Sequence, residues 1–171
     1  MTSPVAVKEI FYAHDIENVM QLDLYKLWRR ARPDGAAIPR RCDLPRDQLQ
    51  RHRGHLMISE LDRANERIVQ RFAADRFRAL QAHLAPGHDV MLGWQSQARH
   101  REILMVVDLF KRPILLSYHV DDVAAERRRA ILALLLPLAE DGETPQMVLH
   151  HAVIADSLNS YGAVTANDSA G

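Results

Sequence analysis

Nine histidines are the side chains in this 171-residue sequence best suited to bind a metal ion. Zinc sites are commonly built from two histidines at i and i+4 of one helix, or from several cysteine thiolates. Here His52 and His55 enclose a glycine, and the adjacent His150 and His151 point to opposite faces of a strand. Cys42 is the single cysteine, so the usual sulfur ligands are lacking. These spacings predict no metal site.

Serine hydroxyls are the candidate nucleophiles. Nucleophilic catalysis needs a histidine or an acid that can take up the hydroxyl proton. Ser59, Ser96 and Ser117 have no such group at the spacing of a known motif. We therefore expect that the protein is not an enzyme.

A basic segment is the strongest charge feature of the sequence. Between Lys26 and Arg53 nine Lys and Arg residues stand against three acids, a local charge of +6 that the remainder balances with −6. Arg40, Arg41 and Arg46 lie in its proline-punctuated part. Such a segment attracts an acidic protein or an anionic ligand, or is simply a solvated surface. No nucleic-acid motif accompanies it, so we expect no nucleic-acid partner.

The composition is that of one globular domain, with 47% hydrophobic and 26% charged residues. The N-terminus has no basic segment followed by an apolar stretch, so it is not a signal peptide. The longest apolar run is shorter than the ~20 residues that span a bilayer, and we expect no membrane attachment. A lone cysteine suits a reducing compartment, which predicts a cytoplasmic protein.

The elements that hold these groups follow from periodicity and turn residues. Apolar positions three and four residues apart predict an amphipathic helix from Ile16 to Ala31. Apolar runs bounded by turn residues predict five strands, at residues 56–61, 67–73, 114–120, 127–138 and 146–156. A helical turn is expected at residues 47–51, and helices from residue 75 to the Pro-Gly break and over residues 96–113. This order predicts an α+β domain, an antiparallel sheet with helices on one face.

The segment "ILALLLPL" does not alternate as a strand with one solvated face would. Both of its faces are therefore expected to be covered, one by the middle helices and the other by the N-terminal helix that carries Trp28. Pro137 lacks an amide hydrogen and should lie at an edge or a bulge.

Several segments together resemble the bacterial PAS family in which a Trp-bearing helix and a Pro-x-Arg-x-Asp segment precede the PAS fold. The matching stretches are "LYKLWRRARPDGAAIPRRCDLPRDQL", "HLMISEL", "RFAADRF", "LAPGHDVMLGW", "RPILLSY" and "LLLPLAEDG". The resemblance implies a PAS-like five-stranded antiparallel sheet whose helices cup a pocket on one face. Where the family usually has Gly-Thr after the second strand, this chain has Ala74 and Asp75.

The resemblance also suggests which residues line the pocket. It places Arg71 at a strand end and Trp94 at the start of the long helix, with Tyr118 and His119 as further ligand-binding candidates. Arg71 would pair with a small organic or anionic ligand and Trp94 would stack on it; alternatively Arg71 forms a structural ion pair. The cofactor is unknown. Haem with one axial histidine is an open alternative. A flavin adduct is not expected, because it needs a cysteine in the helical middle and Cys42 lies before the predicted sheet.

Two functions remain open. The first is a stand-alone sensory or regulatory PAS module that binds a small ligand and signals through protein partners in trans, since no kinase, cyclase or DNA-binding segment follows residue 156. The second is a ligandless dimerising adaptor. In either case we expect a homodimer, because the N-terminal helix offers an apolar stripe. The predicted organisation is an N-terminal extension (1–15), the PAS-like domain with its helix (16–156) and a flexible tail (157–171).

Overall fold

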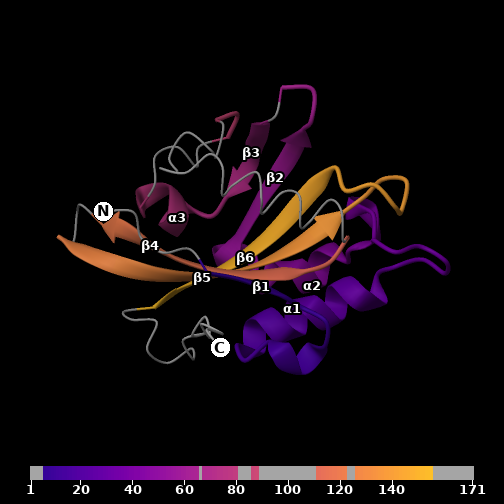
Figure 1. Ribbon diagram of the computed structural model, residues 1–171, viewed down its shortest axis with the longest axis horizontal. Helices are drawn as coiled ribbons and strands as arrows, with labels where there is room; N and C mark the ends of the chain where they lie inside the picture. Colours follow the sequence, from indigo (N-terminus) through magenta and orange to yellow (C-terminus); the bar gives the residue numbers. More distant parts are fainter. Residues whose placement is uncertain (1–5, 66, 81–85, 89–110, 123–125, 156–171) are drawn as a thin grey trace, which may run out of the picture.

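The computed structural model describes residues 6–65, 67–80, 86–88, 111–122 and 126–155. They form an antiparallel six-stranded sheet in the order β1-β4-β5-β6-β2-β3 (Figure 1). The strands are β1 (Ala6–Glu9), β2 (Leu56–Asp62), β3 (Arg67–Ala73), β4 (Ile114–Asp122), β5 (Arg127–Leu138) and β6 (Met147–Ala155). The helices are α1 (Val19–Arg30), α2 (Arg46–Gln50) and α3 (Asp75–Leu80), with 3-10 turns η1 (Ala13–Asp15), η2 (Arg41–Asp43) and η3 (Arg53–His55). The α+β class and the five predicted strands are confirmed.

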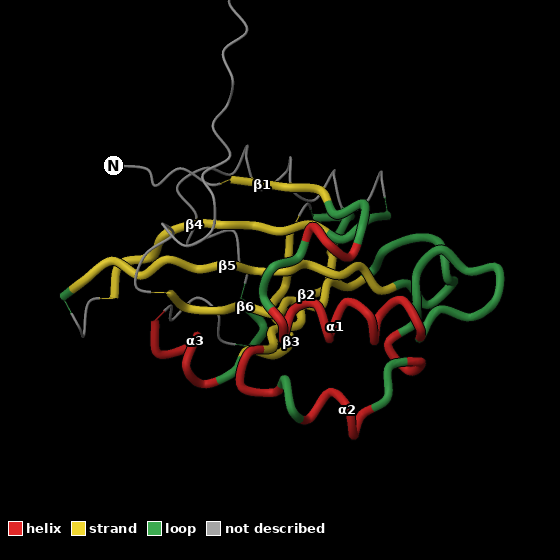
Figure 2. The backbone as a smooth tube through the Cα atoms, turned by 90° about the horizontal axis from the view of Figure 1, so that it is seen from below, coloured by secondary structure: helices red, strands yellow, loops and turns green. Residues whose placement is uncertain are grey.

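Strand β1 was not predicted from the sequence. Its residues 6–9 pair with residues 114–117 of β4, and the amide of Ile10 donates to the Pro113 carbonyl at 2.9 Å. A four-residue strand is too short for a clear alternation of apolar and polar residues. Part of the segment assigned to an N-terminal extension therefore belongs to the sheet, where it covers the edge of β4 (Figure 2).

Strand β5 contributes to two hydrophobic clusters, one on each face of the sheet. Alternate side chains point to opposite faces, so a strand covered on both sides is apolar at nearly every position. On the face toward α3 lie Ile131, Ala133 and Leu135, and on the face toward α1 lie Leu132, Leu134, Leu136 and Leu138. The expectation that both faces of "ILALLLPL" are covered is confirmed.

Helix α1 covers one of these faces. Asn18 caps its start, accepting a hydrogen bond from the Gln21 amide at 3.0 Å. Leu24 and Trp28 are buried as expected, but Val19 is 77% exposed and Met20 is 38% exposed. At 100° per residue Val19 lies about opposite the buried side of the helix, which Gln21 occupies instead. The apolar stripe predicted from the sequence included Val19 and Met20, so it was wrong at its N-terminal end.

Pro137 lies where its missing amide hydrogen is not needed. The β4–β5 pairing ends at Leu135, so Pro137 is beyond the end of β4. The Leu138 carbonyl accepts a hydrogen bond from the amide of Gln146, the residue before β6. Because successive carbonyls of a strand point in opposite directions, the Pro137 carbonyl points away from β6. That carbonyl accepts a hydrogen bond of 2.7 Å from the Trp28 indole nitrogen.

The turn between β5 and β6 anchors the proline-rich segment that follows α1. The carbonyl of Gly142 accepts hydrogen bonds from the amides of Ala37 and Ile38, both at 3.1 Å. Gly142 has φ +77°, and a Cβ there would lie 3.1 Å from the Cβ of Ala36. Glycine therefore suits both the turn and the close approach of the two segments.

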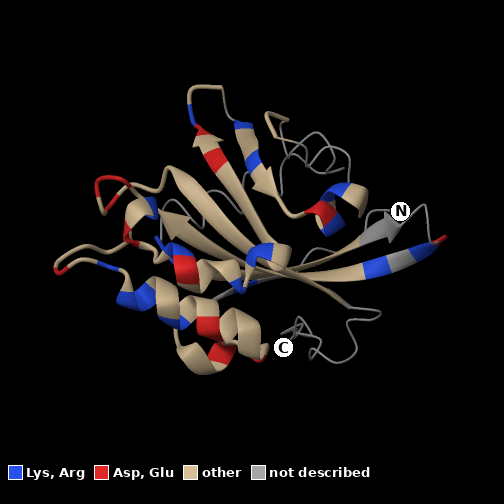
Figure 3. Cartoon of the chain, turned by 180° about the vertical axis from the view of Figure 1, so that it is seen from behind, with Lys and Arg blue, Asp and Glu red and all other residues tan. Residues whose placement is uncertain are grey.

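Helix α3 packs on the face opposite α1 through buried Phe77 (Figure 1). The predicted helix at 96–113 lies outside the described residues, except for its last three positions. None of the described helices is long and apolar enough to cross a membrane. Charged residues lie on α1, α2, α3, on strands β2 and β3, and at the end of the β4–β5 hairpin, whereas β6 carries none (Figure 3).

Candidate functional site

The face of the sheet toward α3 is where the predicted ligand pocket should lie. Tyr118 of β4 is 8% exposed on this face, beside Ile131 and Phe77 in the same cluster. Burial raises the pKa of its phenol above the ordinary range. Tyr118 therefore stays neutral and can donate a hydrogen bond there. Trp94, its predicted neighbour in the pocket, lies outside the described residues.

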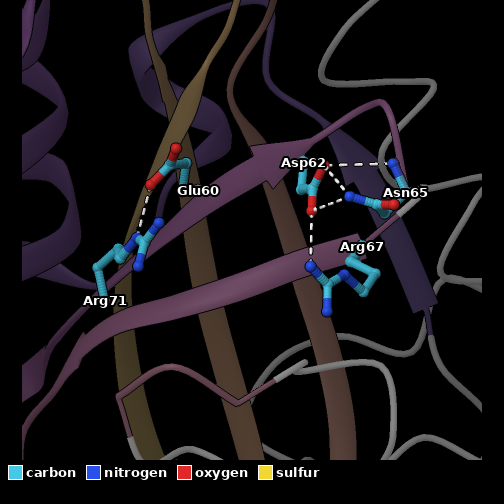
Figure 4. A network of polar contacts seen from close by, with 5 residues as sticks. All are labelled: Glu60, Asp62, Asn65, Arg67 and Arg71. Atoms are coloured by element: carbon cyan, nitrogen blue, oxygen red, sulfur yellow. Dashed lines mark hydrogen bonds and ion pairs between the residues drawn. The ribbon is translucent and has the colours of Figure 1, made fainter.

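Arg71 does not lie on this face. Its Nε donates to the Glu60 carboxylate at 2.5 Å, and both side chains are about half exposed (Figure 4). Glu60 follows Leu56 and Ile58 on the face toward α1, since alternate residues of β2 share a face. In the β2–β3 ladder Ile58 pairs with Phe72 and Ser59 pairs with Gln70, so Arg71 is an extra, unpaired residue of β3 at a bulge. A structural ion pair was the alternative considered for Arg71 in the sequence analysis, and its partner in the structure is Glu60.

His119 also lies apart from Tyr118. The two are neighbours in β4 and so project to opposite faces. The Nδ1 atom of His119 is buried without a hydrogen-bond partner. The structure therefore does not bring Arg71, Tyr118 and His119 together. For Tyr118 and His119 the alternation of side chains along a strand already excluded a shared face. Whether any of them binds a ligand remains a prediction.

A buried polar cluster, which we call the histidine cluster, fills part of the interface between α1 and the sheet. It consists of His52, His55 and His151, with Gln21 of α1 beside it. The His151 ring lies 5.3 Å from that of His52 and 5.1 Å from that of His55. His52 and His151 are almost fully buried, and neither ring nitrogen of His151 has a hydrogen-bond partner among the described residues.

Burial controls the ionisation of the cluster. It lowers the pKa of His151 to about 3, with the neighbouring His55 and His52 adding to the effect. Burial also lowers the pKa of His52, although Asp23, whose Oδ2 is 3.3 Å from His52 Nε2, opposes the shift. Both rings are therefore neutral at pH 7. Sequence reasoning missed the cluster because His52 and His151 are far apart in the chain and meet only through tertiary packing.

Gln21 links α1 to two central strands. Its Nε2 donates to the carbonyl oxygens of Leu132 in β5 and His151 in β6, both at 3.0 Å. Gln21 is fully buried, and its Oε1 has no hydrogen-bond partner. The sequence signal that could have revealed this contact is a polar residue, Gln21, on the apolar side of the predicted helix.

The basic segment is exposed at the positions singled out. Arg40 forms a two-bond contact with Asp43, Nε to Oδ2 at 3.0 Å and Nη2 to Oδ1 at 2.8 Å. This pairing lowers the pKa of Asp43. Arg41 and Arg46 are exposed, and neither has an ion pair within the described part of the chain. Of the three predicted partner-binding residues, two present an uncompensated charge.

Across the residues that the structure describes, no group of His, Cys, Asp and Glu side chains is arranged to hold a metal ion. The three rings of the histidine cluster stack or meet edge to face, which does not aim their nitrogens at one point. Cys42 is exposed in η2.

These features define a class. Without β1, the strands run in the order β3-β2-β6-β5-β4, which is the PAS order 2-1-5-4-3, with α3 on one face. A family model described as a PAS domain, PAS_5, matches residues 17–151. The chain belongs to this PAS family, whose domains are generally sensory and signalling modules and typically non-catalytic.

Several solved structures are similar to the chain. The chain is similar to an RNA-binding light-oxygen-voltage receptor, with a TM-score of 0.50 and 9% identity over 89% of this chain and 39% of the receptor. It is also similar to the light-state LOV domain of Aureochrome1 (TM-score 0.45, 12% identity, 67% of this chain, 91% of that one). A Rhodobacter sphaeroides LOV protein gives TM-score 0.45 and 14% identity over 68% of this chain and 72% of that one. The chain thus spans well under half of the first receptor, and no curated protein matches it.

Proposed function

We propose that this chain is a sensory or regulatory PAS module that binds a small ligand and passes a packing change through the sheet to α1 and a protein partner. The observation that carries the proposal is the attachment of α1 to β5 and β6 by buried hydrogen bonds. Gln21 bonds the Leu132 and His151 carbonyls, and Trp28 bonds that of Pro137. A shift of these strands either moves α1 with them or breaks these buried hydrogen bonds.

The energetics of this interface favour a switch. A buried polar group left without a partner costs ~1–3 kcal/mol. Gln21 Oε1 and both ring nitrogens of His151 are already in that position. These unpaired groups reduce the free energy that holds α1 on the sheet, compared with a fully apolar interface. Two arrangements of the interface that differ by only a few kcal/mol can then both be populated.

Strand β5 supports transmission from the ligand side. Ile131, Ala133 and Leu135 face α3, whereas Leu132, between the first two, accepts the bond from Gln21. A ligand beside Tyr118 that displaces β5 would therefore act directly on the attachment of α1. The proposal leaves out a covalent flavin adduct, because Cys42, the single cysteine of the sequence, is exposed in η2, between α1 and α2.

The alternative is a ligandless dimerising adaptor. Four large apolar side chains are exposed around the start of α1: Phe11, Tyr12, Val19 and Met20. A second copy of the chain could cover them in a two-fold dimer. The uncompensated charges of Arg41 and Arg46 would suit an acidic partner on another surface.

Native mass spectrometry of freshly purified protein tests the proposal. The sensor predicts a retained small-molecule mass, or one that appears on adding a cell-extract metabolite fraction. A bare dimer under every condition would favour the adaptor. The double change Val19→Asp/Met20→Asp should convert a dimer to monomers. The control Arg30→Asp, at an exposed position near the other end of α1, should not. A monomeric wild type with no ligand would contradict both functions.

A further inference from the structure

A hollow of about 540 Å³ lies between η3 and the junction of β3 with α3. It is open to solvent and combines guanidinium groups with an apolar wall. Its lining residues are Arg53, Gly54, Phe72, Ala73, Ala74, Asp75, Arg76 and Arg78. Ligand sites in proteins commonly occupy 300–1,000 Å³ and combine these two kinds of surface.

Two of the three arginines in the hollow carry charge that no carboxylate offsets. Arg78 pairs with Asp75, which is the acid of the lining. The Arg53 side chain makes no hydrogen bond or ion pair with any residue that the structure describes. Arg76 lies over the Phe77 ring at 5.7 Å and against a ring nitrogen of His55 at 3.4 Å, and it has no acidic partner among the described residues. Two guanidinium groups from different elements thus face one space.

The wall is apolar. Ala73 and Ala74 are buried at the end of β3, and Phe72 packs against the hydrophobic cluster under α1. Ala73 and Ala74 each present a methyl group to the wall, where glycine would leave the polar backbone uncovered. We propose that this hollow binds a small organic anion, a phosphate or carboxylate group attached to an apolar body. The anion lies between Arg53 and Arg76, and the body rests on Phe72, Ala73 and Ala74.

The geometry of Arg76 connects this site to the histidine cluster. His55 Nδ1 is 3.4 Å from Arg76 Nη1 and 3.2 Å from the Ala152 carbonyl. Arg76 can only donate, so its bond requires Nδ1 without a proton, whereas the bond to Ala152 requires the proton. An anion that draws Arg76 away therefore favours the tautomer in which His55 bonds Ala152. The His55 ring stacks on His151, whose carbonyl holds Gln21 of α1.

The site deepens the proposed function, because it names the ligand class, and it rests on that function for the signal that reaches α1. Binding itself does not depend on the signal. The two are therefore measured separately.

Isothermal titration in phosphate-free buffer tests the site, with phenyl phosphate, inorganic phosphate and benzyl alcohol as probes. Phenyl phosphate should bind more tightly than phosphate, and benzyl alcohol should not bind. Arg53→Ala should weaken phenyl phosphate about tenfold or more, the loss expected for a charge-assisted hydrogen bond. Lys26→Ala/Arg30→Ala removes two exposed charges of α1 outside the hollow and should leave the affinity unchanged. Equal affinity in all variants, or no binding at millimolar phenyl phosphate, would overturn the site.

Hydrogen exchange of the α1 amides with and without phenyl phosphate tests the signal. The inference predicts changed exchange in α1, and Arg76→Lys, which keeps the charge but loses the planar donor group, should reduce that change more than it reduces affinity. Binding without any change in α1 would keep the site and overturn its link to signalling. Loss of binding would overturn the site but leave the proposed function to other ligands.

Discussion

Trp28 offers a direct measure of how strongly α1 is held on the sheet. Its side chain is 3% exposed, and its indole nitrogen donates to the Pro137 carbonyl at 2.7 Å. Trp28→Ala removes a large buried aromatic, which costs ~3–5 kcal/mol in free energy of unfolding. Trp28→Phe keeps most of the apolar contact and removes the donor, so it should cost ~1–3 kcal/mol by leaving the carbonyl unpaired.

Urea denaturation followed by circular dichroism gives both values. Domains of this size have ~5–15 kcal/mol of stability, so Trp28→Phe stays measurable even if Trp28→Ala unfolds the protein. Lys26→Ala is the control, since Lys26 is exposed on the same helix and its loss should change stability by less than ~0.5 kcal/mol. A cost below ~1 kcal/mol for Trp28→Ala would refute the burial of the indole between helix and sheet.

Three further predictions concern charge. The pKa of His151 is lowered from 6.5 to about 3 in the folded protein, so as pH falls the unfolded chain takes up the proton first. The free energy of unfolding should therefore decrease as the pH drops below 6.5. Urea titrations at several pH values should show a smaller decrease between about pH 6.5 and 4.5 in His151→Gln than in the wild type. The exposed Arg71–Glu60 pair should contribute less than ~1 kcal/mol, and a double-mutant cycle with alanine that gives more would show a stronger role. Arg41→Glu/Arg46→Glu should leave thermal stability unchanged but slow association with an acidic partner captured from lysate. Identical, salt-independent capture by both proteins would mean a solvated surface.

The sequence was a good guide wherever local periodicity decides the structure. The strands at residues 56–61 and 67–73 are bounded by turn residues, and Asp62 and Asn65 form the expected turn, with the Asn65 amide donating to Asp62 Oδ1 at 3.2 Å. The unbroken apolar run of β5 correctly indicated cover on both faces.

The functional groups were harder to predict, because they depend on contacts between distant segments. The histidine cluster joins residues 52, 55 and 151, and the bonds from Gln21 reach across more than a hundred residues of sequence. Arg71 was expected at a pocket, but a bulge and the nearby Glu60 hold it in a surface ion pair. The arginines that share a hollow, Arg53 and Arg76, belong to segments that periodicity does not connect.

A change on the α3 face of β5 should reach α1 through the sheet. Leu135→Ala opens a cavity on that face within β5, and Ile68→Ala opens one on the same face within β3, at the far edge of the sheet. Native-state hydrogen exchange compares the two variants after each is corrected for its global stability. The account predicts that the α1 amides exchange faster in Leu135→Ala than in Ile68→Ala. Equal α1 exchange in the two variants would contradict it.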